Sequence, residues 1–141
     1  MRILVINGPN MNLLGLREPD LYGKEDYDSL LVFIRDVCAA SGAEAECMQS
    51  NHEGAIVDAI QEAYGRFDGI VINPAAYTHT SVAIPDALKA VGIPAVEVHL
   101  TDIRAREVFR QVSYTSAACE TTFAGMGFEG YAQAIRYLVQ R

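Results

Sequence analysis

The sequence predicts an α/β protein with a doubly wound, five-stranded parallel sheet that carries helices on both faces. Short apolar runs rich in Val and Ile alternate along the chain with segments whose apolar residues recur at helical spacing. That alternation is typical of βαβ units. The 141 residues, about half of them apolar, are enough for one globular domain with one core. We therefore expect a single domain over residues 1–141.

Four strands are expected where the short apolar runs fall, and a fifth where β-branched residues cluster. Continuous apolar runs of this length are typical of strands that are buried on both faces. The fifth strand is expected because Thr121 and Thr122 favour an extended backbone. The predicted strands cover residues 3–7, 45–48, 69–73, 95–99 and about 118–123.

Two helices are expected before and after the second strand. Apolar residues between Tyr27 and Cys38 share one helical face and predict a helix over about 27–40, which Gly42 would end. The run Ser50-Asn51-His52-Glu53 has the pattern of a capping box. It predicts a second helix that continues through Tyr64.

Two further helices complete the pattern. The third includes residues 86–90, with Pro85 in or near its first turn and Gly92 at its end. The last covers about residues 130–139. Right-handed crossovers would then give a sheet of flavodoxin-like strand order, in which ligands bind beyond the carboxyl ends of the strands.

Composition excludes several classes of partner. The net charge is −7, from 11 basic and 18 acidic residues, and no basic run occurs, which argues against a nucleic-acid or anionic-membrane surface. The three cysteines lack metal-site or redox spacing and fit reduced thiols. The first apolar run lasts four residues, too short for a secretory signal or a membrane span. We expect a cytoplasmic protein.

Polar side chains gather after four of the predicted strands. Because the carboxyl ends of parallel strands meet at one edge of the sheet, these amides, imidazoles and the carboxylate should converge there. The sequence therefore predicts an active site at that edge. The residues are Asn7, Asn10 and Asn12; Gln49, Ser50, Asn51 and His52; Asn73, Tyr77, Thr78 and His79; and Glu97 and His99.

The segment over about residues 8–25 is too polar and too rich in Gly and Pro for a helix or strand, and is a candidate active-site lid. It places Arg17 five positions before Tyr22. A free phenol is only about one part in a thousand ionised at neutral pH, but a nearby guanidinium favours the phenolate. Tyr22 is therefore a candidate general base. The alternative is a surface ion pair of Arg17 with Glu18 or Asp20.

Glu97 and His99 are two positions apart on a strand that we expect to be buried, so their side chains should point to the same face of the sheet. A buried carboxylate and imidazole need partners or a cleft. The alternative is a purely structural pair. Their position at the strand end favours function, with His99 as general acid and Glu97 orienting it.

No metal or cofactor is expected. His52, His79 and His99 lack a spacing that places two ligands on one helical turn, and the glycines form neither a dinucleotide-binding nor a phosphate-binding loop. The two lysines are Lys24 and Lys89. Imine chemistry would have to rest on Lys24, since Lys89 is expected within a helix away from the strand ends.

Long motifs in register resemble those of the type II 3-dehydroquinate dehydratases. The resemblance covers nearly the whole chain and continues through Arg106-Glu107, Phe109-Arg110 and the region 125–131. The motifs are Asn7-Gly8-Pro9-Asn10-Met11-Asn12-Leu13-Leu14-Gly15, Arg17-Glu18-Pro19, Tyr22-Gly23, Gln49-Ser50-Asn51-His52-Glu53-Gly54, Asn73-Pro74-Ala75-Ala76-Tyr77-Thr78-His79-Thr80-Ser81 and Glu97-Val98-His99-Leu100.

The resemblance implies a lyase that converts 3-dehydroquinate to 3-dehydroshikimate by anti elimination through an enolate, without metal or cofactor. The reaction belongs to the shikimate route to aromatic amino acids or to quinate breakdown. Tyr22 would remove the proton next to the ketone, with Arg17 holding it as phenolate. Asn10 would stabilise the enolate, through an ordered water, and His99 would protonate the departing C1 hydroxyl.

The resemblance also implies the residues that bind the substrate. Asn73, His79 and Arg110 would hold substrate hydroxyls, and the backbone at Leu100 and Thr101 would hold the carboxylate.

A homododecamer of four trimers is implied as well, in which Asp86 would reach the site of a neighbouring subunit.

Three positions depart from the family pattern. Thr101-Asp102 replaces the usual Ser-Asn, Arg104 stands where His is frequent, and Thr121 where Gly is common. Asp102 would weaken the binding of an anionic substrate unless Arg104 or Arg106 neutralises it.

The alternative function is a flavodoxin-like binding module without catalysis, which would leave the convergence of polar residues without a purpose.

Overall fold

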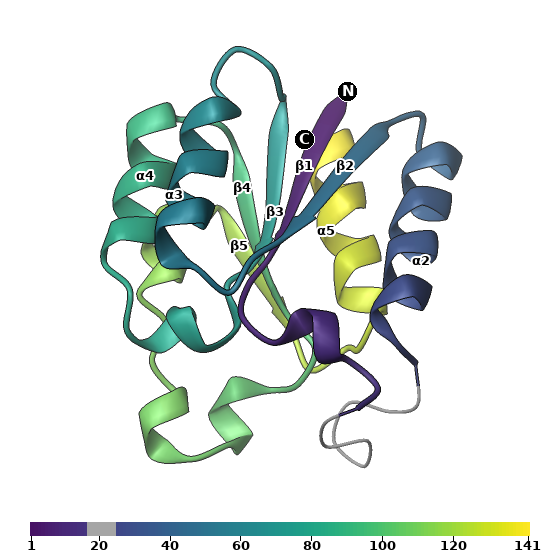
Figure 1. Cartoon of the computed structure of the whole chain (residues 1–141). Helices are drawn as coiled ribbons and strands as arrows, with labels where there is room; N and C mark the ends of the chain where they lie inside the picture. The colour runs from purple at the N-terminus through teal and green to yellow at the C-terminus, as the bar shows by residue number, and fades with distance from the viewer. Residues whose placement is uncertain (17–24) are drawn as a thin grey trace.

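The computed structural model describes residues 1–16 and 25–141, and contains a five-stranded parallel sheet of strand order β2-β1-β3-β4-β5 (Figure 1). The α/β class and the flavodoxin-like, doubly wound arrangement are therefore confirmed. The strands are β1 (Arg2–Asn7), β2 (Glu44–Gln49), β3 (Gly69–Asn73), β4 (Ala95–His99) and β5 (Thr121–Ala124).

In the described part of the chain, α-helices α2 to α5 cover the sheet, with a pair on each face (Figure 1). The pair α2 (Tyr27–Ala40) and α5 (Glu129–Gln140) packs on one face, and the pair α3 (Glu53–Glu62) and α4 (Ala83–Val91) packs on the other. Short 3-10 helices lie in the connections between them. They are η1 (Met11–Leu13), η2 (Ala75–His79), η3 (Ile103–Ala105), η4 (Val108–Arg110) and η5 (Thr115–Ala118).

The side chains of β1 alternate between two apolar cores, one on each face of the sheet. Ile3 and Val5 pack in the core beneath α2 and α5, whereas Leu4 and Ile6 pack in the core beneath α3 and α4. All four are at most 5% exposed. Burial on both faces explains why the strand reads as a continuous apolar run rather than as an alternating one.

The second helix differs from its expected form. It begins at Glu53 and ends at Glu62, and its N-cap residue, His52, makes no side-chain capping bond. The hydroxyl of Ser50 instead accepts a hydrogen bond from the backbone N–H of His52, at 3.0 Å. Because this turn uses the hydroxyl before the helix starts, no capping box forms. Tyr64 lies beyond the helix and is exposed.

The fifth strand is shorter than expected and begins three residues later. Ala118 belongs to η5, and the strand starts at Thr121. The two β-branched threonines that favour extended backbone thus mark its true start.

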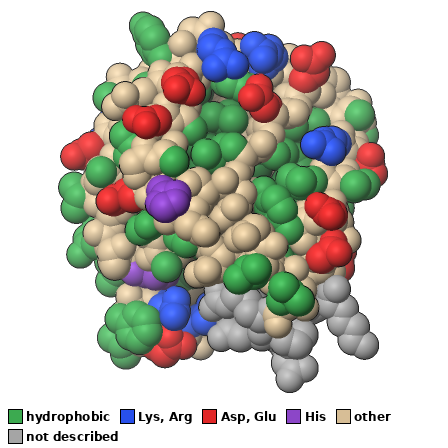
Figure 2. All heavy atoms as spheres, viewed as in Figure 1, with side chains coloured by type: hydrophobic (Ala, Val, Ile, Leu, Met, Phe, Trp, Pro, Cys, Tyr) green, Lys and Arg blue, Asp and Glu red, His purple; other side chains and the backbone are tan. Residues whose placement is uncertain are grey.

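The surface carries mixed charges. On the face shown in Figure 2, acidic side chains lie at several places and the basic ones do not form one continuous patch. Within residues 1–16 and 25–141, no helix is long and apolar enough to cross a membrane.

Gly8 lets the loop after β1 approach the loop after β3. Its N–H donates to the carbonyl of Asn73 at 2.8 Å. A Cβ at this position would lie 2.5 Å from the carbonyl oxygen of Pro74. Backbone, unlike a flexible side chain, cannot easily move aside, so only glycine fits here.

We expect Gly8→Ala to lower the free energy of unfolding by about 1 to 3 kcal/mol, the usual cost of overpacking. Gly54→Ala is the matched control, because no atom lies within 4 Å of its added Cβ. An alanine there, in the first turn of α3, should be neutral or slightly stabilising. Urea denaturation measures both, and equal stabilities of the two variants would contradict the close approach.

Candidate active site

A cavity of about 150 Å³ lies at the carboxyl ends of β1, β3 and β4. This is the sheet edge at which doubly wound folds bind ligands. Its lining combines amides, imidazoles and guanidinium groups with a few apolar side chains. The lining residues are Pro9, Asn10, Met11, Leu14, Asn73, Ala75, Ala76, His79, His99, Leu100, Thr101, Ile103, Arg106 and Arg110.

Most of the site residues expected from sequence come together in this cavity. Asn10, Asn73, His79, His99, Leu100, Thr101 and Arg110 all line it. Asp86 does not line it and is exposed on the first turn of α4. Glu97 lies behind His99, against a separate cavity. Tyr22 and Arg17, and most of the expected lid over 8–25, lie outside the described residues.

Glu97 and His99 form a buried pair on β4. Glu97 is 0% exposed and His99 is 5% exposed, and Nε2 of His99 is hydrogen-bonded to Oε2 of Glu97. A carboxylate acts as the acceptor, so Nε2 carries a proton and Nδ1 is the other ring nitrogen available for chemistry. The arrangement fits an imidazole that transfers a proton through Nδ1 while a carboxylate fixes its orientation.

His79 is oriented by the backbone. Its Nδ1 lies 2.8 Å from the carbonyl oxygen of Val112. A carbonyl can only accept, so Nδ1 carries the proton and Nε2 of the neutral ring is an acceptor. His79 can therefore bind a hydroxyl of a ligand in the cavity.

A buried hydrogen-bonded network lies beneath the cavity. The hydroxyl of Tyr131 donates to Oδ1 of Asn7 at 2.6 Å and accepts from Nδ2 of Asn73 at 3.0 Å. Oδ1 of Asn73 accepts from the N–H of Ala75 at 3.1 Å. Burial raises the pKa of Tyr131, so its hydroxyl stays protonated. The network fixes the amide of Asn73, on β3, at the cavity wall.

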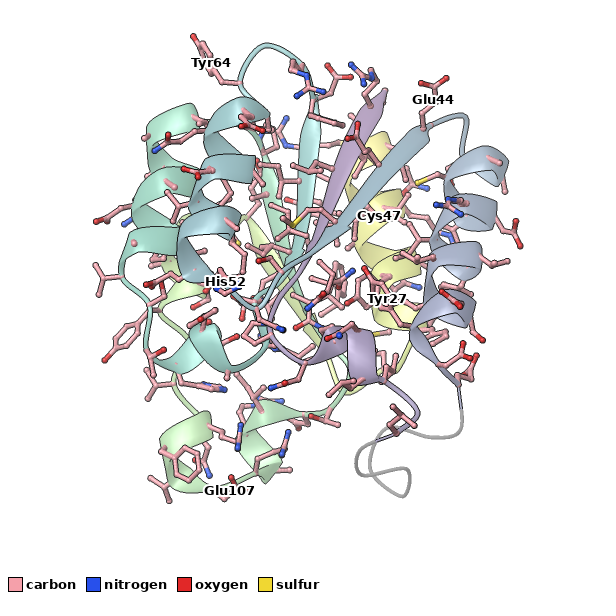
Figure 3. All side chains as sticks on the ribbon, in the orientation of Figure 1. Tyr27, Glu44, Cys47, His52, Tyr64 and Glu107 are labelled. Atoms are coloured by element: carbon pink, nitrogen blue, oxygen red, sulfur yellow. The ribbon has the colours of Figure 1, made fainter. Side chains whose placement is uncertain are left out.

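The loop after β1 is held by the end of β2. The N–H of Asn10 donates to Oδ1 of Asn51 at 3.0 Å, and Nε2 of Gln49 donates to the carbonyl of Gly8 at 3.0 Å. Asn10 itself has φ 68, a left-handed conformation that asparagine tolerates better than most residues. Residues at and just after the end of β2 therefore hold the loop that lines the cavity. His52, which also follows β2, lies close to α3 (Figure 3).

Two arginines give the cavity positive charge. Arg106 and Arg110 both line it. Nε of Arg110 is paired with Oε2 of Glu107, and this hydrogen bond lowers the pKa of Glu107. The arginines make the cavity suited to an anionic ligand.

Asp102 is paired with Arg104. Its Oδ1 accepts from the backbone N–H of Arg104 at 3.0 Å and lies 3.3 Å from Nε of the same residue. The backbone hydrogen bond is the main cause that lowers the pKa of Asp102. Asp102 lines the separate cavity with Glu97 rather than the one with His99. Of the two arginines named as possible partners of Asp102, the structure thus pairs Arg104 with it.

The cysteines are not candidate nucleophiles. All three are free thiols. Burial raises the pKa of Cys47, which lies on β2 (Figure 3), to about 11, and that of Cys119 to about 12. A thiol that stays protonated at neutral pH is a poor nucleophile. Within the described ranges no group of three or more His, Cys, Asp or Glu side chains could hold a metal ion.

The sequence interpretation gave no role to Tyr131 or Ser113, and named Arg106 only as a possible partner of Asp102. Tyr131 could not be singled out because its partners, Asn7 and Asn73, are 124 and 58 positions away. Arg106 lies in one of the family motifs, and its positive charge after β4, like that of Arg110, was an available signal for an anion site.

Replacing Tyr131 with Phe should lower the free energy of unfolding by about 1 to 3 kcal/mol, because two buried amides lose a partner. Tyr137→Phe is the control on the same helix, since its hydroxyl bonds to exposed Glu120. That change should have a much smaller effect. Chemical denaturation measures both, and equal losses would show that the buried network contributes no more than a surface bond.

Known proteins resemble this chain along nearly its full length. A family profile described as Dehydroquinase class II matches residues 1–139. The protein named 3-dehydroquinate dehydratase from Clostridium acetobutylicum is 52% identical over 138 residues, which are 98% of this chain and 96% of the relative. The Aspergillus flavus protein named Catabolic 3-dehydroquinase 2 is 49% identical over 98% of this chain and 92% of its own length.

A solved structure agrees with these relatives. The crystal structure of the type II dehydroquinase from Butyrivibrio crossotus superposes with a TM-score of 0.96 at 53% identity, and covers 98% of this chain and 97% of that one. The resemblance inferred from the motifs is confirmed. The chain belongs to the class II dehydroquinase family.

Proposed function

We propose that this chain is a hydro-lyase that dehydrates 3-dehydroquinate to 3-dehydroshikimate, the shikimate-pathway step that its family and relatives indicate. The observation that carries the proposal is the buried pair of Glu97 and His99 at the wall of a cavity lined by arginines and amides. A proton donor beside an anion site is what elimination of water from a carboxylated substrate requires.

In the proposed mechanism, His99 is the general acid. As imidazolium it keeps Nε2–H on Glu97 and donates the proton on Nδ1 to the departing C1 hydroxyl, which leaves as water. Glu97 stabilises the positive ring and keeps it aligned throughout.

The base is Tyr22, with Arg17 favouring its phenolate. Both lie outside the described residues, and their roles rest on the family motifs. Tyr22 removes the proton next to the ketone, and the enolate that forms is stabilised near Asn10 through an ordered water. Asn10 is exposed at the cavity edge, where water can reach it. The elimination is anti, and no metal or cofactor takes part.

The substrate is held by groups at or after the ends of β3 and β4. His79 offers Nε2 to a substrate hydroxyl, since Val112 occupies its Nδ1. Arg110 binds a further hydroxyl, and the backbone at Leu100 and Thr101, directly after β4, binds the carboxylate. Asn73 is already bonded to Tyr131 and Ala75. A hydrogen bond from Asn73 to a substrate hydroxyl would therefore use a donor or acceptor position that these two bonds leave open.

A flavodoxin-like binding module without catalysis is the competing function. The family membership does not favour it. Adding 3-dehydroquinate to the purified protein should produce the absorbance of a conjugated enone, which a binding module would not give.

Tyr22→Phe should abolish turnover and leave substrate affinity within about threefold of wild type, because it removes one phenolic proton acceptor and little binding area. The same assay and a calorimetric titration measure these two quantities. Tyr64→Phe is the control, since Tyr64 is exposed beyond α3, away from the cavity (Figure 3). Near-normal turnover of Tyr22→Phe would refute the base assignment.

We further propose that the enzyme is cytoplasmic and assembles as a homododecamer of four trimers, with Asp86 completing the site of a neighbouring subunit. Asp86 is exposed and is absent from the described lining of its own cavity. Apolar side chains that an assembly could cover are exposed nearby along the chain at Val82, and also at Val108 and Phe109.

The mass in sedimentation equilibrium should be twelve times the 15.4 kDa of one chain. Mixing two inactive variants, Asp86→Ala and Tyr22→Phe, by reversible dissociation should restore about a quarter of the wild-type activity, because some sites then combine an intact Tyr22 with a neighbour's Asp86. Homogeneous samples of each variant are the control. A monomeric mass or a mixture without activity would contradict the shared site.

A further inference from the structure

Ser113 contacts the buried carboxylate that orients the proposed acid. It lies between η4 and η5, and its Oγ is 2.8 Å from Oε2 and 3.1 Å from Oε1 of Glu97. Glu97 is fully buried, so each of its oxygens depends on protein donors. Ser113 supplies a donor to this carboxylate, and its shorter contact is to Oε2, the oxygen that is also bonded to His99.

The direction of these hydrogen bonds is fixed by a third contact. The backbone N–H of Ser116 donates to Oγ of Ser113 at 3.1 Å. A hydroxyl has a single proton, and the lone pair that accepts from Ser116 leaves that proton directed to Glu97. Ser113 therefore stabilises the carboxylate form of Glu97, which is the form that can hold an imidazolium.

The backbone around Ser113 is anchored on both sides to η2. The carbonyl of Val112 accepts from Nδ1 of His79, and the N–H of Tyr114 donates to the carbonyl of Thr78 at 3.0 Å. These contacts leave Ser113 little freedom to follow Glu97 if the carboxylate moves. The Ser113 hydroxyl is therefore held in place by its own backbone contacts and restrains the position of the Glu97 carboxylate.

Ser113 is not among the described residues that line the cavity with His99; it lines the separate cavity together with Glu97. Its position separates it from the substrate. We propose that Ser113 is a positioning residue that acts on His99 through Glu97, and so raises the rate of protonation of the leaving hydroxyl. This inference rests on the proposed dehydratase function.

Ser113→Ala should lower kcat by about tenfold to a hundredfold, the effect of one hydrogen bond to a charged group. KM should stay within about twofold, because the groups that hold the substrate are untouched. Ser113→Thr, which keeps the hydroxyl, should recover most of the loss. Ser116→Ala is the matched control: it removes a neighbouring hydroxyl that donates to the Ser113 carbonyl but makes no bond to Glu97.

A double-mutant cycle separates positioning from a structural role. If Ser113 acts through Glu97, adding Ser113→Ala to Glu97→Ala should change kcat by less than about twofold. Equal losses in both backgrounds would overturn the inference, as would an unchanged kcat of Ser113→Ala or a matching loss in Ser116→Ala. An inactive wild type would instead refute the dehydratase function itself, so the two failures are distinguishable.

Discussion

The site depends on the need to satisfy polar side chains that are buried at the ends of apolar strands. Asn7, Asn73, Glu97 and His99 are each at most 5% exposed, and a buried polar group without a partner costs more than a typical hydrogen bond contributes. Asn7, Asn73 and Glu97 find partners in other segments, whereas His99 bonds to Glu97 on the same strand. Those partners tie the strand ends to α5 through Tyr131 and to the segment before η5 through Ser113.

The same hydrogen bonds decide the chemistry that each ring can perform. A carbonyl on Nδ1 leaves His79 with Nε2 for a ligand, whereas a carboxylate on Nε2 leaves His99 with Nδ1. The two imidazoles thus receive opposite tautomers in one cavity. The partner of His99 is a carboxylate and that of His79 is a carbonyl, and the proposed mechanism therefore assigns the role of general acid to His99.

The fold could be predicted from sequence because burial on both faces leaves a local signature, the short Val- and Ile-rich runs of β1 and β3. The placement of His99 and His79 followed from strand ends alone. The role of Ser113 did not, because its contact with Glu97 exists only once η5 packs near β4. The absent capping box shows the same limit over a few residues. The Ser50 hydroxyl could have capped the helix, but it instead accepts a hydrogen bond from the N–H of His52 in the turn before the helix.

The net charge of −7 would by itself oppose the binding of an anionic substrate. Salt screens exposed charges beyond about 8 Å under physiological conditions, so the groups at the cavity decide the local potential. Arg106 and Arg110 line it, while the nearby carboxylate of Asp102 is held by Arg104. Glu107 is paired with Arg110, one of these two arginines. An acidic protein can therefore place guanidinium groups at a cavity even though carboxylates nearby are paired with some of them.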